Sequence, residues 1–460
     1  MILSHDDQVI IAQCTPNGSG AIALLRISGT HAISVASKIS KLASGKSLLS
    51  LPTHTVHFGF IIDAQGNHID QVMFTIMQGP KTFTGQDVVE ITCHNNPFII
   101  QEIIDQALAH GARLAQAGEF TKRAVLNDKI DLIQAEAINE LIHANTQMAL
   151  KKSLAQLEGS FSSWIFAIEK TLIKALAFSE ASFEFIDEEM TFSNQIKQMI
   201  SSTLQTITVI KKTFDQQLHI RQGVRIAIIG SVNAGKSSLF NALLHKERAI
   251  VTNIAGTTRD VIEAGVYKDN SYWTLIDTAG LRQTNDIIEK EGIKRSGQEA
   301  QLADIILLVF DGSRTISGDE QIVYKELLEK YQHKTIIIQN KADLPAHYNE
   351  LIAQLSGVIA LSSNDAIAVA KVEEKISSTI TALLEKNESP FLLNKRHYNL
   401  LIDLEKRLLE IDSMLLHESP AYELLSYHLN DALAFLCELT GKTISEQGMD
   451  AVFREFCVGK

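Results

Sequence analysis

The sequence predicts a multidomain fold of the α/β plus α class: an N-terminal α+β domain, a helical bundle domain, and an inserted α/β domain whose mostly parallel sheet has flanking helices. Three observations predict it. Strand-like and helix-like segments alternate over the first 120 residues. Residues 121–218 contain no proline and a single glycine, and their apolar residues recur at helical spacing. The same texture returns in residues 394–416 and 422–439, after an α/β pattern that begins at Val224.

Composition restricts the class of protein further. A chain of 460 residues allows about three domains, and 45% hydrophobic and 21% charged residues are ordinary for a soluble globular protein. We expect neither a signal segment nor a membrane span. The four cysteines form no CxxC pair, which favours a reducing cytoplasm over a disulfide framework. A net charge of −12 argues against nucleic-acid binding by the whole surface, although a local basic patch or a basic partner could recruit RNA.

The N-terminal α+β domain is expected to span residues 1–120. Apolar alternation predicts strands over 9–12 and 21–27, on either side of a turn-rich segment, and further strands over 56–62 and 88–93. Residues 31–42 are predicted to form a helix.

The helical domain is expected in two parts, residues 121–218 and 383–460, with the inserted domain at 223–382 between them. Gln222-Gly223 and the segment 386–390 have the composition of paired linkers. Insertion is plausible because the ends of a compact domain often lie close together. The alternative is two separate helical domains, and we favour one bundle.

A phosphate-binding loop, Gly230 to Ser237, follows the apolar run Val224–Ile229 and precedes a helix-like stretch. Gly230 and Gly235 let the backbone curl, so that successive N–H groups face a polyphosphate at a helix N-terminus. Lys236 supplies a point charge for the outer phosphates, and the Ser237 hydroxyl can ligate Mg²⁺.

Three motifs downstream indicate which nucleotide binds. Asp277 to Gly280 (Asp-Thr-Ala-Gly) suits a water-bridged Mg²⁺ and a γ-phosphate, and the Gly256 to Asp260 segment suits a switch loop whose threonine reaches Mg²⁺. Asn340 to Asp343 (Asn-Lys-Ala-Asp) ends in a carboxylate that can accept both N1–H and N2–H of guanine, which adenine cannot match. Each motif alone could be a polar turn. In this order they predict guanine-nucleotide binding, and ATP is the disfavoured alternative.

Together with further segments, these residues closely resemble the MnmE (TrmE) family of tRNA modification GTPases. The resemblance runs from end to end; besides the nucleotide motifs it rests on Ala12 to Pro16, Leu25 to Gly29, Phe83 to Asp87, Gly118 to Thr121, Leu126 to Leu132, Asp277 to Arg282 and the final Cys457-Val458-Gly459-Lys460.

The resemblance implies a dimerising, folate-binding N-terminal domain, a helical domain and an inserted P-loop GTPase domain. Such proteins form a homodimer and a heterotetramer with an FAD-containing partner, MnmG or GidA. They add an aminomethyl or carboxymethylaminomethyl group to C5 of the wobble uridine, position 34, of certain tRNAs. A tetrahydrofolate derivative, 5-formyl or methylene, supplies the one-carbon unit. Arg26, Glu90, Lys129 and Lys460 fall at the family's folate-contacting positions.

The nucleotide contacts that the motifs and the resemblance assign lie in five segments. They are Asn233, Ala234, Gly235, Lys236, Ser237 and Ser238; Thr252, Asn253, Ile254, Ala255, Gly256, Thr257 and Thr258; Asp277, Thr278, Ala279 and Gly280; Asn340, Lys341, Ala342 and Asp343; and Ser362, Ser363 and Asn364. Ser237 and Thr258 are the expected Mg²⁺ ligands.

The residue that orients the attacking water is not a glutamine adjacent to Gly280, because Leu281 occupies that position. Glu289 matches the family's catalytic glutamate, which acts through an intervening water. The alternative is a solvated acidic turn, since Asp286 and Glu291 lie nearby.

A potassium ion takes the place of an arginine finger in the family. The resemblance assigns its ligands to Asn233, Thr252, Ile254 and Thr257. The alternative for Asn233 is that it merely caps the phosphate loop.

The C-terminal tail offers two candidates. Cys457 could be a nucleophile of lowered pKa in the tRNA chemistry, or a passive residue that simply packs. Lys460 is the stronger candidate, as a contact to the folate carboxylate, and this requires the tail to reach the N-terminal domain.

Two functional hypotheses share the nucleotide motifs. The first is a K⁺-stimulated GTPase of tRNA wobble-uridine modification, and the second is a GTP-dependent RNA-binding assembly switch of the ribosome biogenesis type. The folate-like N-terminal domain and the Cys-Val-Gly-Lys tail favour the first, because an assembly switch requires neither.

Overall fold

The computed structural model describes residues 8–16, 18–184, 192–212, 214, 223–245, 262–268, 271–277, 297–347, 350–385, 390–417 and 420–460. The chain divides into two compact units. The first contains Met1–Ile142, Ser153–Thr208 and Asn394–Lys460, and the second contains His143–Lys152 and Val209–Leu393. The predicted fold class, multidomain α/β plus α, is confirmed.

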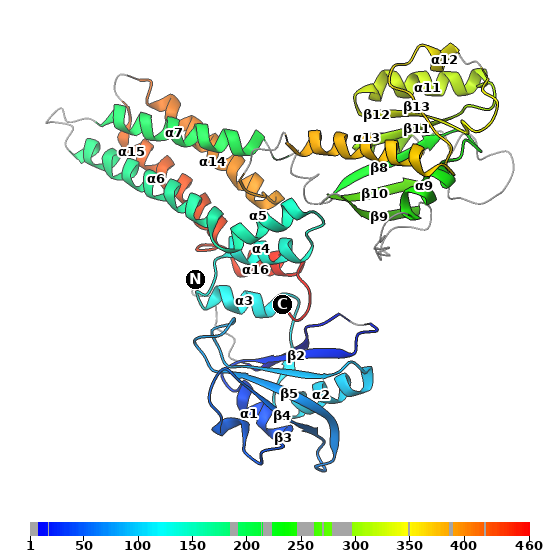
Figure 1. Ribbon diagram of the computed structural model, residues 1–460. Coiled ribbons are helices and arrows are strands. Elements are labelled where there is room, and N and C mark those ends of the chain that lie inside the picture. Colours follow the sequence, from blue (N-terminus) through cyan, green and yellow to red (C-terminus); the bar gives the residue numbers. More distant parts are fainter. Residues whose placement is uncertain are drawn as a thin grey trace. The chain divides into compact units, whose positions relative to one another are not determined.

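The N-terminal part of the first unit is a sheet backed by two helices (Figure 1). Its strands within the described residues are β1 Ile10–Gln13, β2 Ile22–Ser28, β3 Ser40–Leu42, β4 Thr55–Ile62, β5 His68–Met77, β6 Val88–His94 and β7 Arg113–Leu114. They lie in the order β3-β4-β5-β6-β2-β1-β7, antiparallel except for the β1–β7 pair. The helices are α1 Ala32–Lys38 and α2 Pro97–Ala109, with a 3₁₀ turn at Leu48–Ser50.

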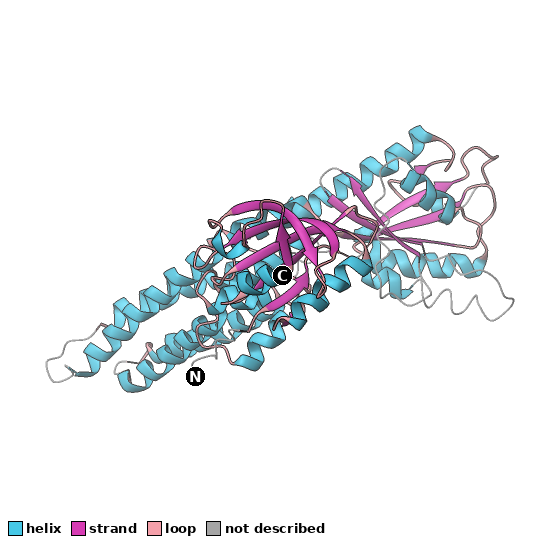
Figure 2. Ribbon diagram, turned by 90° about the horizontal axis from the view of Figure 1, so that it is seen from below, coloured by secondary structure: helices cyan, strands magenta, loops and turns pink. Residues whose placement is uncertain are grey.

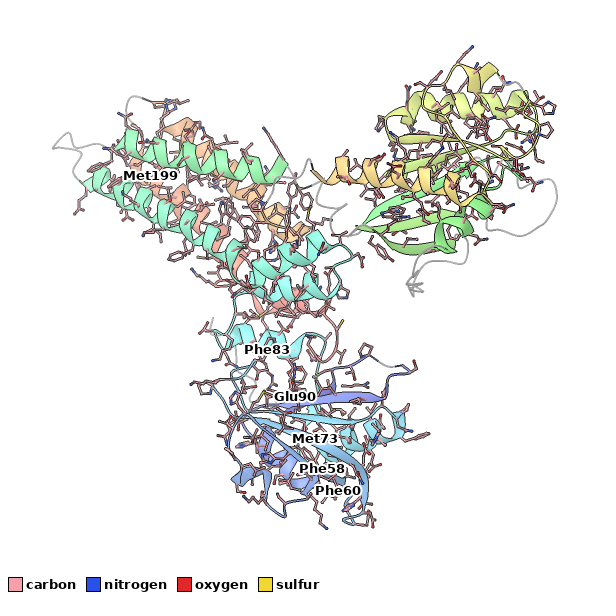
Figure 3. All side chains as sticks on the ribbon, viewed as in Figure 1. Phe58, Phe60, Met73, Phe83, Glu90 and Met199 are labelled. Atoms are coloured by element: carbon pink, nitrogen blue, oxygen red, sulfur yellow. The ribbon has the colours of Figure 1, made fainter. Side chains whose placement is uncertain are left out.

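The two faces of this sheet differ because side chains alternate along each strand. Leu25, Ile27 and Ile91 point to the face that α1 and α2 cover, and all three are fully buried. The strand register places Arg26 and Glu90 on the opposite face, together with the partly exposed Phe58 and Met73. Figure 3 labels Glu90, Phe58 and Met73 on this sheet. Charged and apolar groups are therefore presented together on one face.

One predicted element is wrong in its extent. The helix expected over residues 31–42 ends at Lys38, and Ser40–Leu42 form β3 instead. Pairing with β4, Ser40 opposite Ile61, supplies the backbone hydrogen bonds that a longer helix would have made. Ile39 and Leu42 are buried in the same core as α1, so the apolar pattern of the segment suits either structure.

The helices on either side of the inserted domain form one bundle, not two separate domains: in Figure 1 green helices from before the insertion lie beside orange and red helices from after it, and Figure 2 shows the bundle from below. The elements are α3 Glu119–Leu126, α4 Leu132–Ile142, α5 Gln147–Leu157, α6 Ser160–Glu184, α7 Ser193–Lys212, α14 Lys395–Met414, α15 Tyr422–Thr440 and α16 Glu446–Phe453. Ser179 of α6 donates to the carbonyl of Tyr422, and Thr208 of α7 donates to Glu405 of α14. Among the described residues, no helix combines the length and apolarity that crossing a membrane requires.

The second unit has a parallel sheet with one antiparallel edge. Its described strands are β8 Val224–Gly230, β9 Ile262–Lys268, β10 Ser271–Asp277, β11 Ile305–Asp311, β12 Thr335–Asn340 and β13 Ile359–Ala360, in the order β13-β12-β11-β8-β10-β9. Only the β9–β10 pair among them is antiparallel. The helices are α9 Lys236–His245, α11 Gly318–Tyr331, α12 Glu350–Ala353 and α13 Ala366–Glu385, with a 3₁₀ turn at Gln332–Lys334.

Helices cover both faces of this sheet, so its central strands are apolar on both sides. Ile226 and Ile228 of β8 pack with α9 and α13, whereas Ala227 and Ile229 pack with α11. The continuous apolar run from Val224 to Ile229 follows from this double burial.

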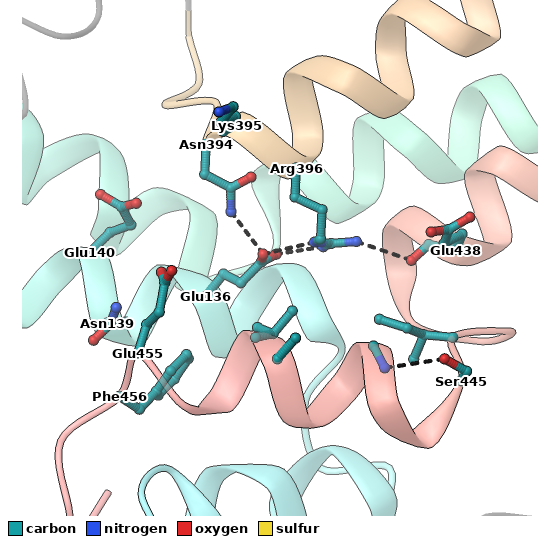
Figure 4. A pocket seen from close by; sticks show the side chains of 14 residues that line it. Glu136, Asn139, Glu140, Asn394, Lys395, Arg396, Glu438, Ser445, Glu455 and Phe456 are labelled. Carbon is teal, nitrogen blue, oxygen red and sulfur yellow. Dashed lines mark hydrogen bonds and ion pairs between the residues drawn. The ribbon is translucent and has the colours of Figure 1, made fainter.

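A buried carboxylate joins the parts of the bundle that precede and follow the insertion. Glu136 of α4 accepts hydrogen bonds from Asn394 Nδ2 (2.7 Å) and from Arg396 Nε and Nη2 (2.9 and 2.6 Å), and its Oε2 pairs with His397 Nε2 at 2.6 Å. Figure 4 shows Glu136, Asn394 and Arg396 at the edge of a cavity that Glu455 and Phe456 also line. Burial by itself would raise the pKa of the Glu136 carboxyl, but His397 and Arg396 outweigh it and hold this pKa well below its usual range.

We predict that Glu136→Gln destabilises the bundle by about 3–5 kcal/mol, because it leaves buried cationic groups without their counter-charge. Glu169→Gln is the control, since its partner Lys442 is exposed, and it should cost no more than about 1 kcal/mol. Denaturant unfolding of the full chain can be followed by Trp164 fluorescence in a Trp273→Phe background, because the chain has only these two tryptophans.

The pH dependence provides a second check. A carboxyl with a depressed folded-state pKa stabilises the protein above its unfolded-state value of about 4.3. This contribution is lost as the pH falls from there through the folded-state pKa. The difference between wild type and Glu136→Gln should therefore shrink below about pH 4, and an equal difference at pH 7 and pH 3 would contradict the assignment.

Candidate nucleotide-binding site

The phosphate loop connects β8 to α9 and has glycine at two positions where a Cβ would not fit. A Cβ on Gly230 would lie 2.3 Å from the Val309 carbonyl oxygen. Gly235 has φ +91°, and a Cβ there would lie 2.0 Å from Asn340 Nδ2. Between them Asn233 has φ +62°, a left-handed conformation that asparagine tolerates better than most residues. These constraints explain the glycine spacing of the motif.

Lys236 opens α9 with its side chain folded across the loop. Its Nζ donates to the carbonyl oxygens of Gly230 and Ser231, both at 2.8 Å, and the residue is 7% exposed. Burial lowers the pKa of Lys236, and the carboxylate of Asp277 opposes this shift. The loop thus holds a cation at the position where the motif predicts the outer phosphates.

Ser237 and Asp277 bring two oxygen ligands together. Asp277 ends β10, which runs parallel to β8, so its carboxylate emerges at the same edge of the sheet as the phosphate loop. Ser237 Oγ donates to Asp277 Oδ2 at 2.8 Å. Hydroxyl and carboxylate oxygens suit Mg²⁺, which keeps several waters and takes few protein ligands. The donor set therefore fits the predicted metal.

The guanine motif lies directly against the phosphate loop. Asn340 ends β12 and is 2% exposed; its Nδ2 donates to the Ala234 carbonyl (2.9 Å), and its Oδ1 accepts from Ser363 Oγ (3.1 Å). Ala342 N donates to the carbonyl of Leu361, which precedes Ser362. Asp343 is exposed, so its carboxylate is accessible to a base. The structure brings the three segments Asn233–Ser238, Asn340–Asp343 and Ser362–Asn364 to one edge of the sheet.

Several predicted residues lie outside the part of the chain that the structure describes. They are Thr252, Asn253, Ile254, Ala255, Gly256, Thr257, Thr258, Thr278, Ala279, Gly280 and Glu289. Their roles with the switch loop, Mg²⁺, K⁺ and the attacking water stay predictions.

A second group of predicted residues gathers on the N-terminal sheet. Arg26 of β2 and Glu90 of β6 are register partners, and Arg26 Nε and Nη2 donate to Glu90 Oε1 at 2.9 and 2.7 Å. The guanidinium also lies 5.9 Å from the ring centre of Phe83 and 5.6 Å from that of Phe120. A charged pair between aromatic rings suits a planar polar ligand.

The end of the chain reaches this group. Val458 forms a bridge with Ala117, and Gly118 N donates to the Cys457 carbonyl. Cys14 Sγ donates to the Gly459 carbonyl at 3.1 Å. Burial raises the pKa of the Cys14 thiol, which is also subject to the charges of Arg26, Glu90 and Lys460. Lys460 thus lies within electrostatic reach of the same group.

Two further predicted residues, Lys129 and Cys457, belong to this group. Lys129 packs against Gly85, where an added Cβ would meet Lys129 Cε at 3.0 Å. The Cys457 side chain is exposed, and a chemical role for it stays a prediction. Sequence reasoning missed Cys14, Phe83 and Phe120 as neighbours of Arg26, although all three belong to motifs that carried the family resemblance.

The parallel sheet, the phosphate loop and the guanine motif define a P-loop GTPase domain. Two family models match the chain: the GTP-binding protein TrmE N-terminus over residues 9–129 and the MnmE helical domain over residues 132–457. The tRNA modification GTPase MnmE of Lactiplantibacillus plantarum is 37% identical over 98% of both chains. Those of Aquifex aeolicus and Bacillus subtilis are 36% and 37% identical, each over 98% of this chain and 99% of the relative.

The chain therefore belongs to the MnmE family of tRNA modification GTPases, and it is a GTP hydrolase.

Proposed function

We propose that this protein hydrolyses GTP in order to modify tRNA. With an FAD-containing partner of the MnmG/GidA type, it adds an aminomethyl or carboxymethylaminomethyl group to C5 of the wobble uridine, using a tetrahydrofolate one-carbon unit. The observation that supports this most is the pairing in one chain of a GTPase site with the Arg26–Glu90 group on the N-terminal sheet. A ribosome assembly switch needs only the first of these, so we rank it second.

Each residue of the nucleotide site has a distinct task in this proposal. Asp343 accepts the guanine N1–H and N2–H, and Lys236 neutralises the outer phosphates. Ser237 and Thr258 ligate Mg²⁺, with Asp277 acting through water. The bound Mg²⁺ would offset charge on the transferred phosphoryl group.

For the hydrolysis step we propose that Glu289 orients the attacking water and that K⁺ binds the oxygens of Asn233, Thr252, Ile254 and Thr257. The exposed side chain of Asn233, a residue of the phosphate loop with a left-handed backbone, supports the assignment of K⁺.

We predict that GTP turnover is faster in K⁺ than in Na⁺ at equal ionic strength, because Na⁺ is too small for an oxygen cage that fits K⁺.

We also predict that Glu289→Ala lowers kcat by about 10²–10⁴-fold and leaves GTP affinity nearly unchanged, since the carboxylate acts mainly in the transition state. Glu291→Ala is the control and should stay close to wild type. Equal rates in both salts would remove K⁺ from the proposal, and near-normal turnover by Glu289→Ala would remove Glu289.

We propose that the N-terminal site binds a reduced folate through Arg26, Glu90, Lys129 and Lys460. The ion pair, the two aromatic rings and the nearby tail supply charges and a flat apolar surface for a pterin with a glutamate tail.

In calorimetry with 5-formyltetrahydrofolate, Arg26→Ala should weaken binding by about 10-fold or more, as expected for the loss of a charge-assisted hydrogen bond. Lys41→Ala, an exposed residue of the same sheet, is the control. Because Arg26→Ala leaves Glu90 unpaired, Arg26→Lys is measured beside it and thermal unfolding verifies both folds. Wild-type affinity in a folded Arg26→Ala protein would refute the placement.

We propose a homodimer formed through the N-terminal domain, and a heterotetramer with the partner enzyme in the cytoplasm. Support for the dimer comes from apolar side chains on the uncovered face of neighbouring strands: Val56, Phe58 and Met73 are 57%, 45% and 39% exposed. Apolar groups gathered on one face indicate a protein contact. Sedimentation of the full chain, against a Phe58→Asp variant, measures this state.

The whole proposal is tested in a strain that lacks this gene. Nucleoside analysis of its tRNA should show loss of the C5-modified wobble uridine. Wild-type protein should restore it, whereas Lys236→Ala should not, because that variant lacks the phosphate-binding cation. Normal tRNA nucleosides together with a ribosome assembly defect would favour the assembly switch.

A further inference from the structure

The first turn of the phosphate loop is held by residues that the GTPase motifs do not include. Ser231 N donates to the Tyr324 hydroxyl at 2.7 Å, and Arg314 Nη2 donates to Ser231 Oγ at 2.9 Å. Both partners come from the segment that forms α11 or directly precedes it. The backbone and the side chain of Ser231 are therefore fixed from the same direction.

The start of α11 is rigid enough to serve as this support. Ser317 and Glu320 form a capping box, which satisfies the first N–H groups of the helix. Glu320 accepts two hydrogen bonds from Arg314, and this interaction, with help from Ser317 and Ser231, lowers the pKa of Glu320 to about 2. Tyr324, one turn further along, is 4% exposed and packs edge-on against Phe310 with ring centres 4.6 Å apart.

The same network continues to the guanine motif. Arg314 Nε lies 3.7 Å from Asp311 Oδ2, and that oxygen accepts from Lys341 Nζ at 2.6 Å. Asp311 ends β11 and is 5% exposed, so its carboxylate has a fixed position between the two cations. Lys341, Asp311, Arg314 and Ser231 thus form a continuous path from the base-recognition loop to the phosphate loop.

The second half of the phosphate loop is held from the other side. Asn340 Nδ2 donates to the Ala234 carbonyl at 2.9 Å. Between the two anchors lies Asn233 at φ +62°, a conformation that costs free energy and persists only where its surroundings impose it. The anchors at Ser231 and Ala234 supply that constraint.

We propose that Arg314 and Tyr324 are positioning residues for GTP hydrolysis. They hold Ser231, and so set the conformation of the phosphate loop around Asn233, while Asp311 ties the same support to Lys341 of the guanine motif. The proposal depends on the GTPase activity and on neither folate nor potassium, so it can fail or hold independently of those assignments.

The test is a double-mutant cycle in the full-length protein. Steady-state kcat/KM for GTP is measured for Arg314→Gln, for Ser231→Ala and for the double variant. Each single change should lower kcat/KM by about 5- to 30-fold. The kcat/KM of the double variant should be no more than about twofold below that of the less active single variant, because both changes break the same hydrogen bond between Arg314 and Ser231. Tyr324→Phe removes only the hydroxyl, keeps the ring packing, and should lower kcat/KM in the same range.

Lys268→Gln is the matched control. Lys268 pairs with Glu373 at 2.8 Å in the same domain, but it lies at the end of the sheet opposite the phosphate loop. This variant should stay within about twofold of wild type, and thermal unfolding should verify that every variant is folded. Losses that multiply in the double variant, a Lys268→Gln loss equal to that of Arg314→Gln, or near-normal turnover by Arg314→Gln and Tyr324→Phe would each overturn the proposal.

Discussion

The bundle depends on the buried carboxylate of Glu136. Among the described residues, five helices of the bundle come before the inserted domain and three come after it, so the sequence cannot join the two groups by a short turn. Asn394, Arg396 and His397 all bind Glu136 at the point where the chain re-enters the bundle, 258 residues further along in the case of Asn394. A buried charge is stabilising only when its partners are in place, and for that reason it selects one docking position of α14 against α4.

In the nucleotide site the backbone, rather than a side chain such as that of Glu136, defines the shape. Gly230 and Gly235 allow contacts with Val309 and Asn340 that no other residue would fit. Oriented N–H groups at the start of α9 then need no rearrangement when an anion arrives, which is the physical advantage of a preformed loop. The side chains of Lys236 and Asn340 both bind carbonyl groups of the loop and so hold this backbone in place.

A feature of the fold or of the site could be predicted from the sequence when the interactions that determine it join residues close together in the chain. The strand Val224–Gly230 and the positions of Lys236 and Asn340 in the nucleotide motifs were predictable, because apolar runs and motif spacing are local properties. The boundary between α1 and β3 was not, since pairing of Ser40 with Ile61 decides it. The contact of Cys14 with Gly459 joins residues 445 positions apart, and the Arg314 network depends on how α11 packs against β8. Long-range packing of this kind leaves no periodic signal in a single sequence.

The C-terminal tail shows why the N-terminal site cannot be understood from its own domain. Gly118 has φ +66°, and a Cβ there would lie 2.8 Å from the Phe453 carbonyl at the end of α16. Gly459 has φ +92°, and a Cβ there would lie 2.5 Å from the Gln13 carbonyl. Close-packed backbone at both contacts leaves no space for the tail to shift by itself. Lys460 follows directly after these contacts and influences the Cys14 thiol electrostatically, as Arg26 and Glu90 do, so the C-terminal tail contributes to the electrostatics of this part of the N-terminal sheet.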